Sequence, residues 1–217
     1  MARPRSTLTT KIANRMAGKA PHGVWTPADF HDLGKRDAID KALQRLERSG
    51  NIRRIDRGLY DKLRVSSLTN RHTAPDYQCI IDALARRSQA RMLVDGLTAA
   101  NDLGLTTAVP GKAVIHTDMR RAPITLDNLT IEFRLTAPSK LYWAGRPAMR
   151  VVQALHWLKD KLPDNRVEKQ LVKILSDPAH EAIRKDLIAG LKTLPSWMLS
   201  VVKELLDKSA GCQTRRP

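Results

Sequence analysis

The first sixty residues contain four segments whose order narrows the fold of this chain more than any other feature. Apolar side chains at helical spacing predict a first helix over residues 7–17. Residues 26–29, with the sequence TPAD, supply an N-cap residue, a proline at the first helical position and an acid at the third. A second helix is therefore expected to begin there and to end at Gly34, whose left-handed conformation would make a tight turn.

A third helix and a short basic hairpin are expected next. Residues 35–49 place an apolar stripe on one side of a helix, formed by Ala38, Ile39, Ala42, Leu43 and Leu46. Residues 52–55 then alternate apolar and basic side chains, Asp56-Arg57-Gly58 predicts a turn, and Leu59-Tyr60 begins a return strand. Helix, helix, turn, helix and hairpin in this order predict a winged helix-turn-helix domain over residues 1–65.

The third helix and the hairpin carry long polar side chains that suit contacts with duplex DNA. The expected DNA-binding residues are Lys35, Arg36, Lys41, Gln44, Arg45 and Arg48 on the helix and Arg53, Arg54 and Arg57 on the hairpin. Asp37 and Asp40 are expected to cap or orient neighbouring basic groups. A basic amphipathic helix alone is more often a solvated surface, so it is the hairpin beside it that favours DNA binding.

The charge balance points to a polyanionic partner. The formal net charge is +16, and residues 1–64 hold 15 Lys and Arg against 7 Asp and Glu, while residues 65–217 hold 23 against 15. Nucleic acid or an acidic membrane surface would fit this excess. No stretch approaches twenty apolar residues, and aromatic residues make up 4%, which is too few for stacking of single-stranded bases. Duplex DNA is therefore the expected partner, with no membrane.

The remaining chain predicts a mixed domain over residues 76–210 that follows a polar connector at 66–75. Its expected elements are helices at 77–91 and 96–103, strands at 114–117, 124–126 and 129–135, and helices at 147–161, 164–176, 178–192 and 195–208. Asp127-Asn128 would join the last two strands as a hairpin. The expected fold class is thus α+β, with a small antiparallel sheet and a helical C-terminal part.

The sequence contains no recognisable catalytic or metal-binding pattern. Cys79 and Cys212 lie far apart and outside any Cys/His cluster, and His116 and Asp118 have no complementary group at a useful spacing. We expect no catalytic residue, no metal and no cofactor. The N-terminus lacks the apolar core of a signal peptide, so a cytoplasmic protein is expected.

Two groups of segments together carry a family resemblance. The first group comprises residues 24–30, 38–46, 50–54 and 57–60, and the second comprises 96–107, 109–110, 116–118, 129–133 and 195–198. In these segments the chain resembles AbiEi-type antitoxins, a bacterial winged-helix family of type IV toxin-antitoxin (abortive infection) systems. The resemblance implies an antitoxin that represses its own operon and counters a nucleotidyltransferase-type toxin through its C-terminal region. Direct contact with the toxin stays open.

Three functions therefore compete. The first is an autorepressing antitoxin whose two copies bind an inverted repeat in operator DNA. The second is a stand-alone winged-helix transcriptional regulator whose C-terminal domain senses a ligand or oligomerises. The third, a DNA-processing enzyme, would require metal-dependent cleavage or nucleotide transfer, which the sequence does not favour.

Overall fold

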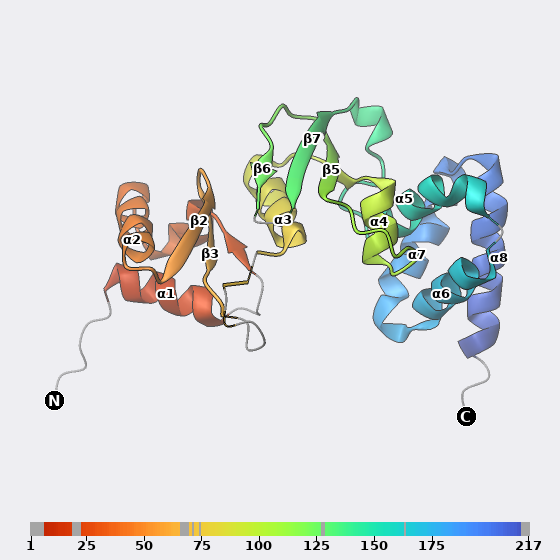
Figure 1. The fold of residues 1–217 in the computed structure, drawn as a ribbon, viewed down its shortest axis with the longest axis horizontal. Coiled ribbons are helices and arrows are strands. Elements are labelled where there is room, and N and C mark those ends of the chain that lie inside the picture. The colour runs from red at the N-terminus through yellow and green to blue at the C-terminus, as the bar shows by residue number, and fades with distance from the viewer. Residues whose placement is uncertain are drawn as a thin grey trace. The chain divides into compact units, whose positions relative to one another are not determined.

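The structure, a computed structural model, describes residues 7–18, 23–65, 70, 72–73, 75–126, 129–162 and 164–213, and the side chains up to residue 211. The chain divides into two units (Figure 1). The first comprises residues 1–90 with 124–128, and the second comprises residues 91–123 with 129–217. The fold is α+β, and each unit contains its own sheet and helices.

The first unit begins with a helical pair and a three-stranded antiparallel sheet. Its elements are α1 (Leu8–Gly18), β1 (Val24–Trp25), a 3-10 helix (Pro27–Leu33), α2 (Arg36–Arg48), β2 (Ile52–Asp56) and β3 (Leu59–Lys62). The strand order is β1-β3-β2, so β3 of the hairpin pairs with the short strand β1, which precedes it by more than thirty residues. Gly58 adopts a φ of +70° at the hairpin turn, a conformation that favours glycine.

The expected second helix is a 3-10 helix, and the turn after it differs from the prediction. Thr26 and Asp29 form the capping box, in which the Thr26 main-chain N–H donates to Asp29 Oδ2 over 2.7 Å. Gly34 was expected to be left-handed, but its φ of 169° is extended. Lys35, the N-cap of α2, is also extended. Two extended residues therefore join the 3-10 helix to α2, and no left-handed residue is needed there.

The core of the first unit lies between α1, α2 and the sheet. Its buried members are Ile12, Met16, Trp25, Phe30, Ile39, Ala42, Leu43, Leu46, Ile52 and Tyr60. The rings of Trp25 and Phe30 stack with centroids 5.4 Å apart. Ala38, expected in the apolar stripe of α2, is exposed, because at 3.6 residues per turn it lies outside the face that Ile39 and Leu43 bury.

The first unit also includes α3 (Tyr77–Ser88), which lies beyond the connector expected at residues 66–75. Asp76 caps this helix by accepting a hydrogen bond from the Gln78 main-chain N–H. Two arginines near its end bind the sheet region: Arg86 donates to the Val24 carbonyl over 3.2 Å and Arg87 to the Arg57 carbonyl over 2.8 Å. The unit that holds the hairpin therefore extends to the end of α3, with β6 (Ile124–Thr125) also assigned to it.

The sheet of the second unit is mixed. It contains β4 (Met92–Val94), β5 (Lys112–Thr117) and β7 (Thr130–Leu135), with β4 antiparallel to β5 and β5 parallel to β7. The β4 strand was not expected, and the parallel pair departs from a wholly antiparallel sheet. The turn residues Asp127 and Asn128 of the expected hairpin lie outside the described residues.

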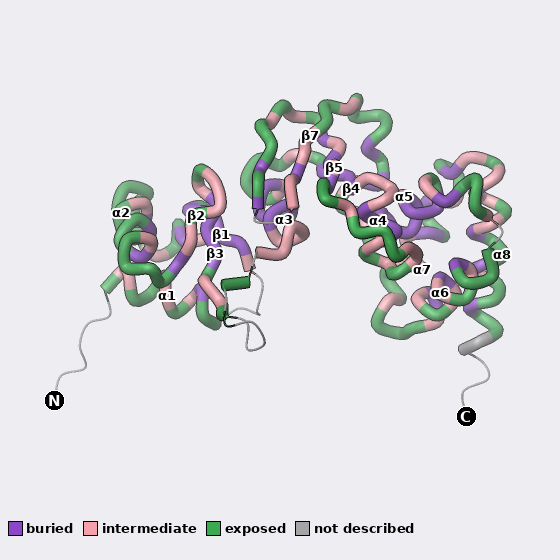
Figure 2. Tube along the Cα trace, in the orientation of Figure 1, coloured by how far each residue is buried: buried purple, intermediate pink, exposed green. Residues whose placement is uncertain are grey.

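Helices make up the rest of the second unit. They are α4 (Gly96–Asp102), α5 (Met149–Leu158), α6 (Asn165–Ser176), α7 (Glu181–Gly190) and α8 (Ser196–Gln213), with short 3-10 helices at 138–140, 159–161, 178–180 and 191–193. Each of these α-helices contains buried apolar residues, and Figure 2 shows buried positions along α5 and α6. Among the described residues, no helix combines the length and the apolar character needed to cross a bilayer.

Candidate nucleic-acid interface

The side of α2 that faces away from the core carries the polar residues expected to bind DNA. Ile39, Ala42, Leu43 and Leu46 bury one face of this helix. At 3.6 residues per turn, the opposite face presents five exposed side chains, which we call the α2 outer face: Asp37, Lys41, Gln44, Arg45 and Arg48. A helix that packs with one side and projects long polar groups from the other has the shape that enters a major groove.

The cations of the α2 outer face have no competing partner in the described part of the chain. Lys41, Arg45 and Arg48 form no ion pair with any described residue. Arg36 differs, because its Nε donates to Asp40 Oδ2 over 2.8 Å within the same helix. The expected orienting role of Asp40 is therefore confirmed, whereas the outer-face cations remain available for an external anion.

Arg53, expected near DNA, is engaged inside the first unit. Its guanidinium donates to both carboxylate oxygens of Asp61, over 3.1 and 2.7 Å, and to the Thr73 carbonyl over 3.0 Å. The pairing follows from strand register, since Arg53 lies opposite Asp61 in the antiparallel ladder. The Asp61 side chain is only 9% exposed, so Arg53 compensates a buried carboxylate.

Arg54 points to the other face of β2, as strand alternation requires, and is exposed. It lies opposite Tyr60, whose hydroxyl pKa is raised chiefly by burial; the positive charge of Arg54 acts in the opposite direction. Asp40 and Glu47 of α2 raise the same pKa. Tyr60 thus experiences charges from both the hairpin and α2.

The hairpin tip is held from α3. Arg57 is exposed at the turn, and its main-chain oxygen accepts the hydrogen bond from Arg87. The same Arg87 nitrogen lies 3.4 Å from the Gly58 carbonyl. This contact anchors the backbone of the tip and leaves the Arg57 side chain without an ion pair in the described residues.

A family model matches residues 11–183 of the chain. The chain belongs to the DUF6088 family, a family of unknown function. A search of curated proteins finds no match. The DUF6088 region begins within α1 and ends within α7, so it contains the α2 outer face, the hairpin and the sheet of the second unit.

In this DUF6088 chain, the structure brings most of the expected DNA-binding residues onto α2 and the hairpin beside it. Lys41, Gln44, Arg45 and Arg48 share the α2 outer face, Lys35 is exposed before the first turn, and Arg36, Arg54 and Arg57 are exposed beside them. Arg53 is directed elsewhere. Sequence reasoning missed Arg86 and Arg87, and the available signal was two consecutive arginines in the last turn of an amphipathic helix.

The residues considered for catalysis or metal binding, His116, Asp118 and Cys79, each have separate surroundings. His116 Nδ1 lies 3.1 Å from Thr136 Oγ1, and Asp118 accepts a hydrogen bond from the Arg91 main-chain N–H. Burial raises the pKa of the half-buried Cys79 thiol, which disfavours a thiolate nucleophile. Among the described residues of this DUF6088 chain, no group of three His, Cys, Asp or Glu side chains is placed to hold a metal ion.

Proposed function

We propose that this DUF6088 chain binds duplex DNA and that residues 7–62 act as a winged helix. The order of α1, β1, the 3-10 helix, α2 and the β2–β3 hairpin, together with the pairing of β1 with β3, supports this proposal. The observation that carries it is the α2 outer face, where three exposed cations have no ion-pair partner in the described residues.

In the proposed complex, α2 lies in the major groove. Gln44 suits the paired donor and acceptor of adenine, and Arg45 and Arg48 suit the two acceptors of guanine. Arg54 and Arg57 on the hairpin, with Lys35 and Arg36 at the start of α2, lie beside the reading face and suit phosphate contacts. The outer face of α2 would then contact the bases, and the cations on the hairpin and at the start of α2 would neutralise the phosphate charge.

Arg53 has a different role in this proposal. Because its guanidinium is bound to Asp61 and to the Thr73 carbonyl, it links the two strands of the hairpin to each other and to Thr73. We therefore treat Arg53 as a positioning residue, whereas Arg54, its neighbour on the opposite face, is the residue proposed to reach DNA.

We also propose that the chain is an antitoxin that represses its own operon and counters a nucleotidyltransferase-type toxin in the cytoplasm. The resemblance of segments within residues 24–60, 96–133 and 195–198 to AbiEi-type antitoxins supports this role. The alternative is a transcriptional regulator without a toxin. Co-expression with the neighbouring gene separates the two, because the antitoxin must restore growth that the neighbour alone suppresses.

The DNA-binding proposal is tested by titrating the full chain with a fluorescent duplex from its own promoter and with a scrambled duplex. If Lys35, Arg36, Arg54 and Arg57 each neutralise one phosphate, affinity falls about 100-fold between roughly 50 and 200 mM salt. The promoter duplex should bind more tightly at every salt concentration. Failure to bind either duplex at low salt would overturn the proposal.

A matched pair of variants locates the interface. Lys41→Glu/Arg45→Glu reverses two charges one helical turn apart on the α2 outer face, and we expect it to abolish binding. Lys169→Glu/Lys173→Glu makes the same change in net charge at two exposed positions of α6 in the second unit. Equal losses from both variants would show nonspecific attraction to the net charge and contradict the assignment of α2.

A further inference from the structure

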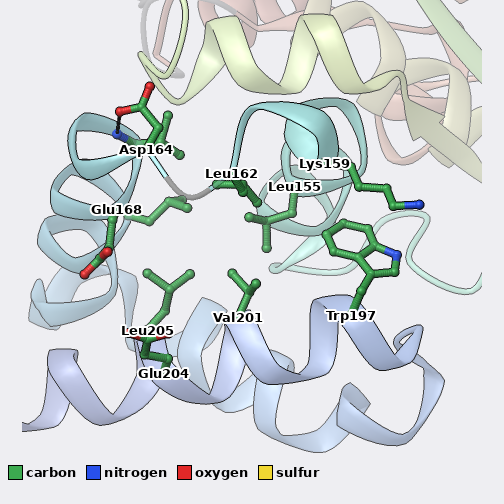
Figure 3. A pocket seen from close by; sticks show the side chains of 11 residues that line it. Leu155, Lys159, Leu162, Asp164, Glu168, Trp197, Val201, Glu204 and Leu205 are labelled. Carbon is green, nitrogen blue, oxygen red and sulfur yellow. Dashed lines mark hydrogen bonds between the residues drawn. The ribbon is translucent and has the colours of Figure 1, made fainter.

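The second unit contains an apolar cavity of about 310 Å³ that the DNA-binding proposal does not use (Figure 3). It lies among α5, α6 and α8 and the chain that joins α5 to α6. Its floor is made by four side chains that are at most 4% exposed: Leu155, Val167, Leu171 and Leu205. Leu162, Trp197 and Val201 complete the apolar wall. Pockets for small molecules begin at about this size and have mostly apolar linings.

Three carboxylates line one side of the cavity, and each already has a partner. Asp164 caps α6 by accepting a hydrogen bond of 2.7 Å from the Arg166 main-chain N–H. Glu168 and Glu204 both bind the Lys208 ammonium, over 2.5 and 2.6 Å. These hydrogen bonds raise the pKa of Lys208, so the ammonium stays charged and offsets one of the two negative charges.

The other side of the cavity presents a cation without such a partner. In Figure 3, Lys159 lies next to Trp197, away from Asp164 and Glu168. The Lys159 ammonium is 5.6 Å from the centre of the Trp197 ring and forms no ion pair with any described residue. An aromatic ring attracts a cation through its quadrupole but carries no net charge, so the charge of Lys159 remains uncompensated.

We propose that this cavity binds a small amphipathic anion, with an apolar chain over the leucine floor and a carboxylate against the Lys159 ammonium. The apolar floor excludes a strongly polar ligand, because burying polar groups there without partners costs free energy. The Lys159 ammonium, beside Trp197 and away from Asp164 and Glu168, favours a negative head group at that end of the cavity. A cavity of about 150 Å³ holds a benzene ring, so one of this size suits a ligand of about 12 non-hydrogen atoms.

Decanoate, which has that size, and the neutral 1-decanol are the probes, titrated below their aggregation limits into the full chain by isothermal titration calorimetry. We expect one site per chain and an affinity for decanoate about two- to fivefold above that for decanol, the preference that one exposed ion pair supplies. No binding of either probe, or equal binding of both, would overturn the proposal.

Three variants assign the site. Lys159→Gln should remove the preference for decanoate and keep the binding of decanol. Its control is Lys161→Gln, since Lys161 also lies over a tryptophan, 4.5 Å from the Trp157 ring centre, but does not line the cavity. Val201→Trp should fill the cavity and abolish the binding of both probes. Because Lys159 is exposed, we expect the Lys159→Gln variant to retain the fold. If this variant still preferred decanoate to decanol, the result would contradict the assigned head-group site.

Discussion

The guanidinium of Arg87, near the end of α3, donates a hydrogen bond of 2.8 Å to the main-chain oxygen of Arg57 at the tip of the β2–β3 hairpin. The two residues are thirty positions apart in the sequence. An arginine bound to a main-chain oxygen restrains the backbone without occupying the side chain that the tip presents. The hairpin tip, which we propose lies near DNA, is therefore held by a residue outside the winged-helix domain that the sequence predicts over residues 1–65.

Replacing Arg87 should loosen the hairpin tip. Arg87→Ala removes a charge-assisted hydrogen bond at an exposed position, so we expect a loss of less than about 1 kcal/mol in global stability. Hydrogen exchange of the main-chain amides at residues 56–59 should nevertheless become faster. Arg91→Ala is the control, because Arg91 also donates to a main-chain oxygen, that of Pro138, but in the second unit. Unchanged exchange at the tip would contradict the anchoring role.

Arg53 and Arg54 should differ sharply in their effect on stability. Arg53→Met leaves the buried Asp61 carboxylate without its partner, and we expect a loss of about 1 to 3 kcal/mol, reduced from the value for a fully buried pair because Arg53 is 26% exposed. Arg54→Met, at an exposed neighbouring position, should change stability by less than about 0.5 kcal/mol. Urea unfolding measures both, and similar losses would argue against the structural role of Arg53.

The same hairpin and α2 should separate sequence recognition from charge neutralisation. Gln44→Ala or Arg45→Ala should cost about 1 to 3 kcal/mol on promoter DNA and much less on scrambled DNA. Arg54→Ala should weaken both complexes alike and reduce the salt slope by about one. Fluorescence anisotropy on the two duplexes measures these effects. Equal losses on both duplexes for all three variants would oppose the assignment of α2 as the reading helix.

Gly190 should tolerate no side chain, although it lies at the end of a helix. A Cβ atom there would lie 2.1 Å from Cη2 of Trp143, so Gly190→Ala must displace a buried indole. We expect a loss of about 1 to 3 kcal/mol from this overpacking. Gly211→Ala in α8 meets no atom within 4 Å and should gain about 0.5 to 1 kcal/mol. Thermal unfolding compares the two, and a stabilised Gly190→Ala variant would contradict the packing.

Two histidines should make the second unit less stable in mild acid. Burial lowers the pKa of His116, aided by Arg134, and burial also lowers the pKa of His156, aided by Lys159. The unfolded chain, with an ordinary histidine pKa of about 6.5, therefore takes up protons first as the pH falls. Stability should be complete above about pH 6.5 and decline below it.

Urea unfolding between about pH 7.5 and pH 5 measures this dependence. The double variant His116→Gln/His156→Gln should flatten the decline, whereas His31→Gln, at an exposed position in the first unit, should leave it unchanged. A decline that persists in the double variant would assign it to other groups.

Local sequence patterns predicted the elements that depend only on residues close together in the sequence. The 3.6-residue period located α2, and Gly58 located the hairpin turn, because each depends on contacts or conformations within a few residues. The β4 strand was missed because Met92, Leu93 and Val94 are all buried, and a run of three buried residues shows no alternation.

Long-range pairing explains the remaining differences. The parallel alignment of β5 with β7 depends on how the chain returns after Thr117, which no local motif states. The diversion of Arg53 depends on its register against Asp61 across the hairpin. The cavity near Trp197 arises from the packing of three helices, each of which has an ordinary amphipathic sequence.

Because α3 anchors the hairpin, a chimera of this chain and a related chain should take both elements from the same parent. A chimera that exchanged only residues 1–65 would import a hairpin tip without the Arg86 and Arg87 that bind Val24 and Arg57 in this chain. Unless the recipient supplied equivalent arginines, the transplanted tip would lose its fixed geometry. A junction after Ser88, the last residue of α3, keeps these contacts within one parent and is expected to preserve the hairpin tip.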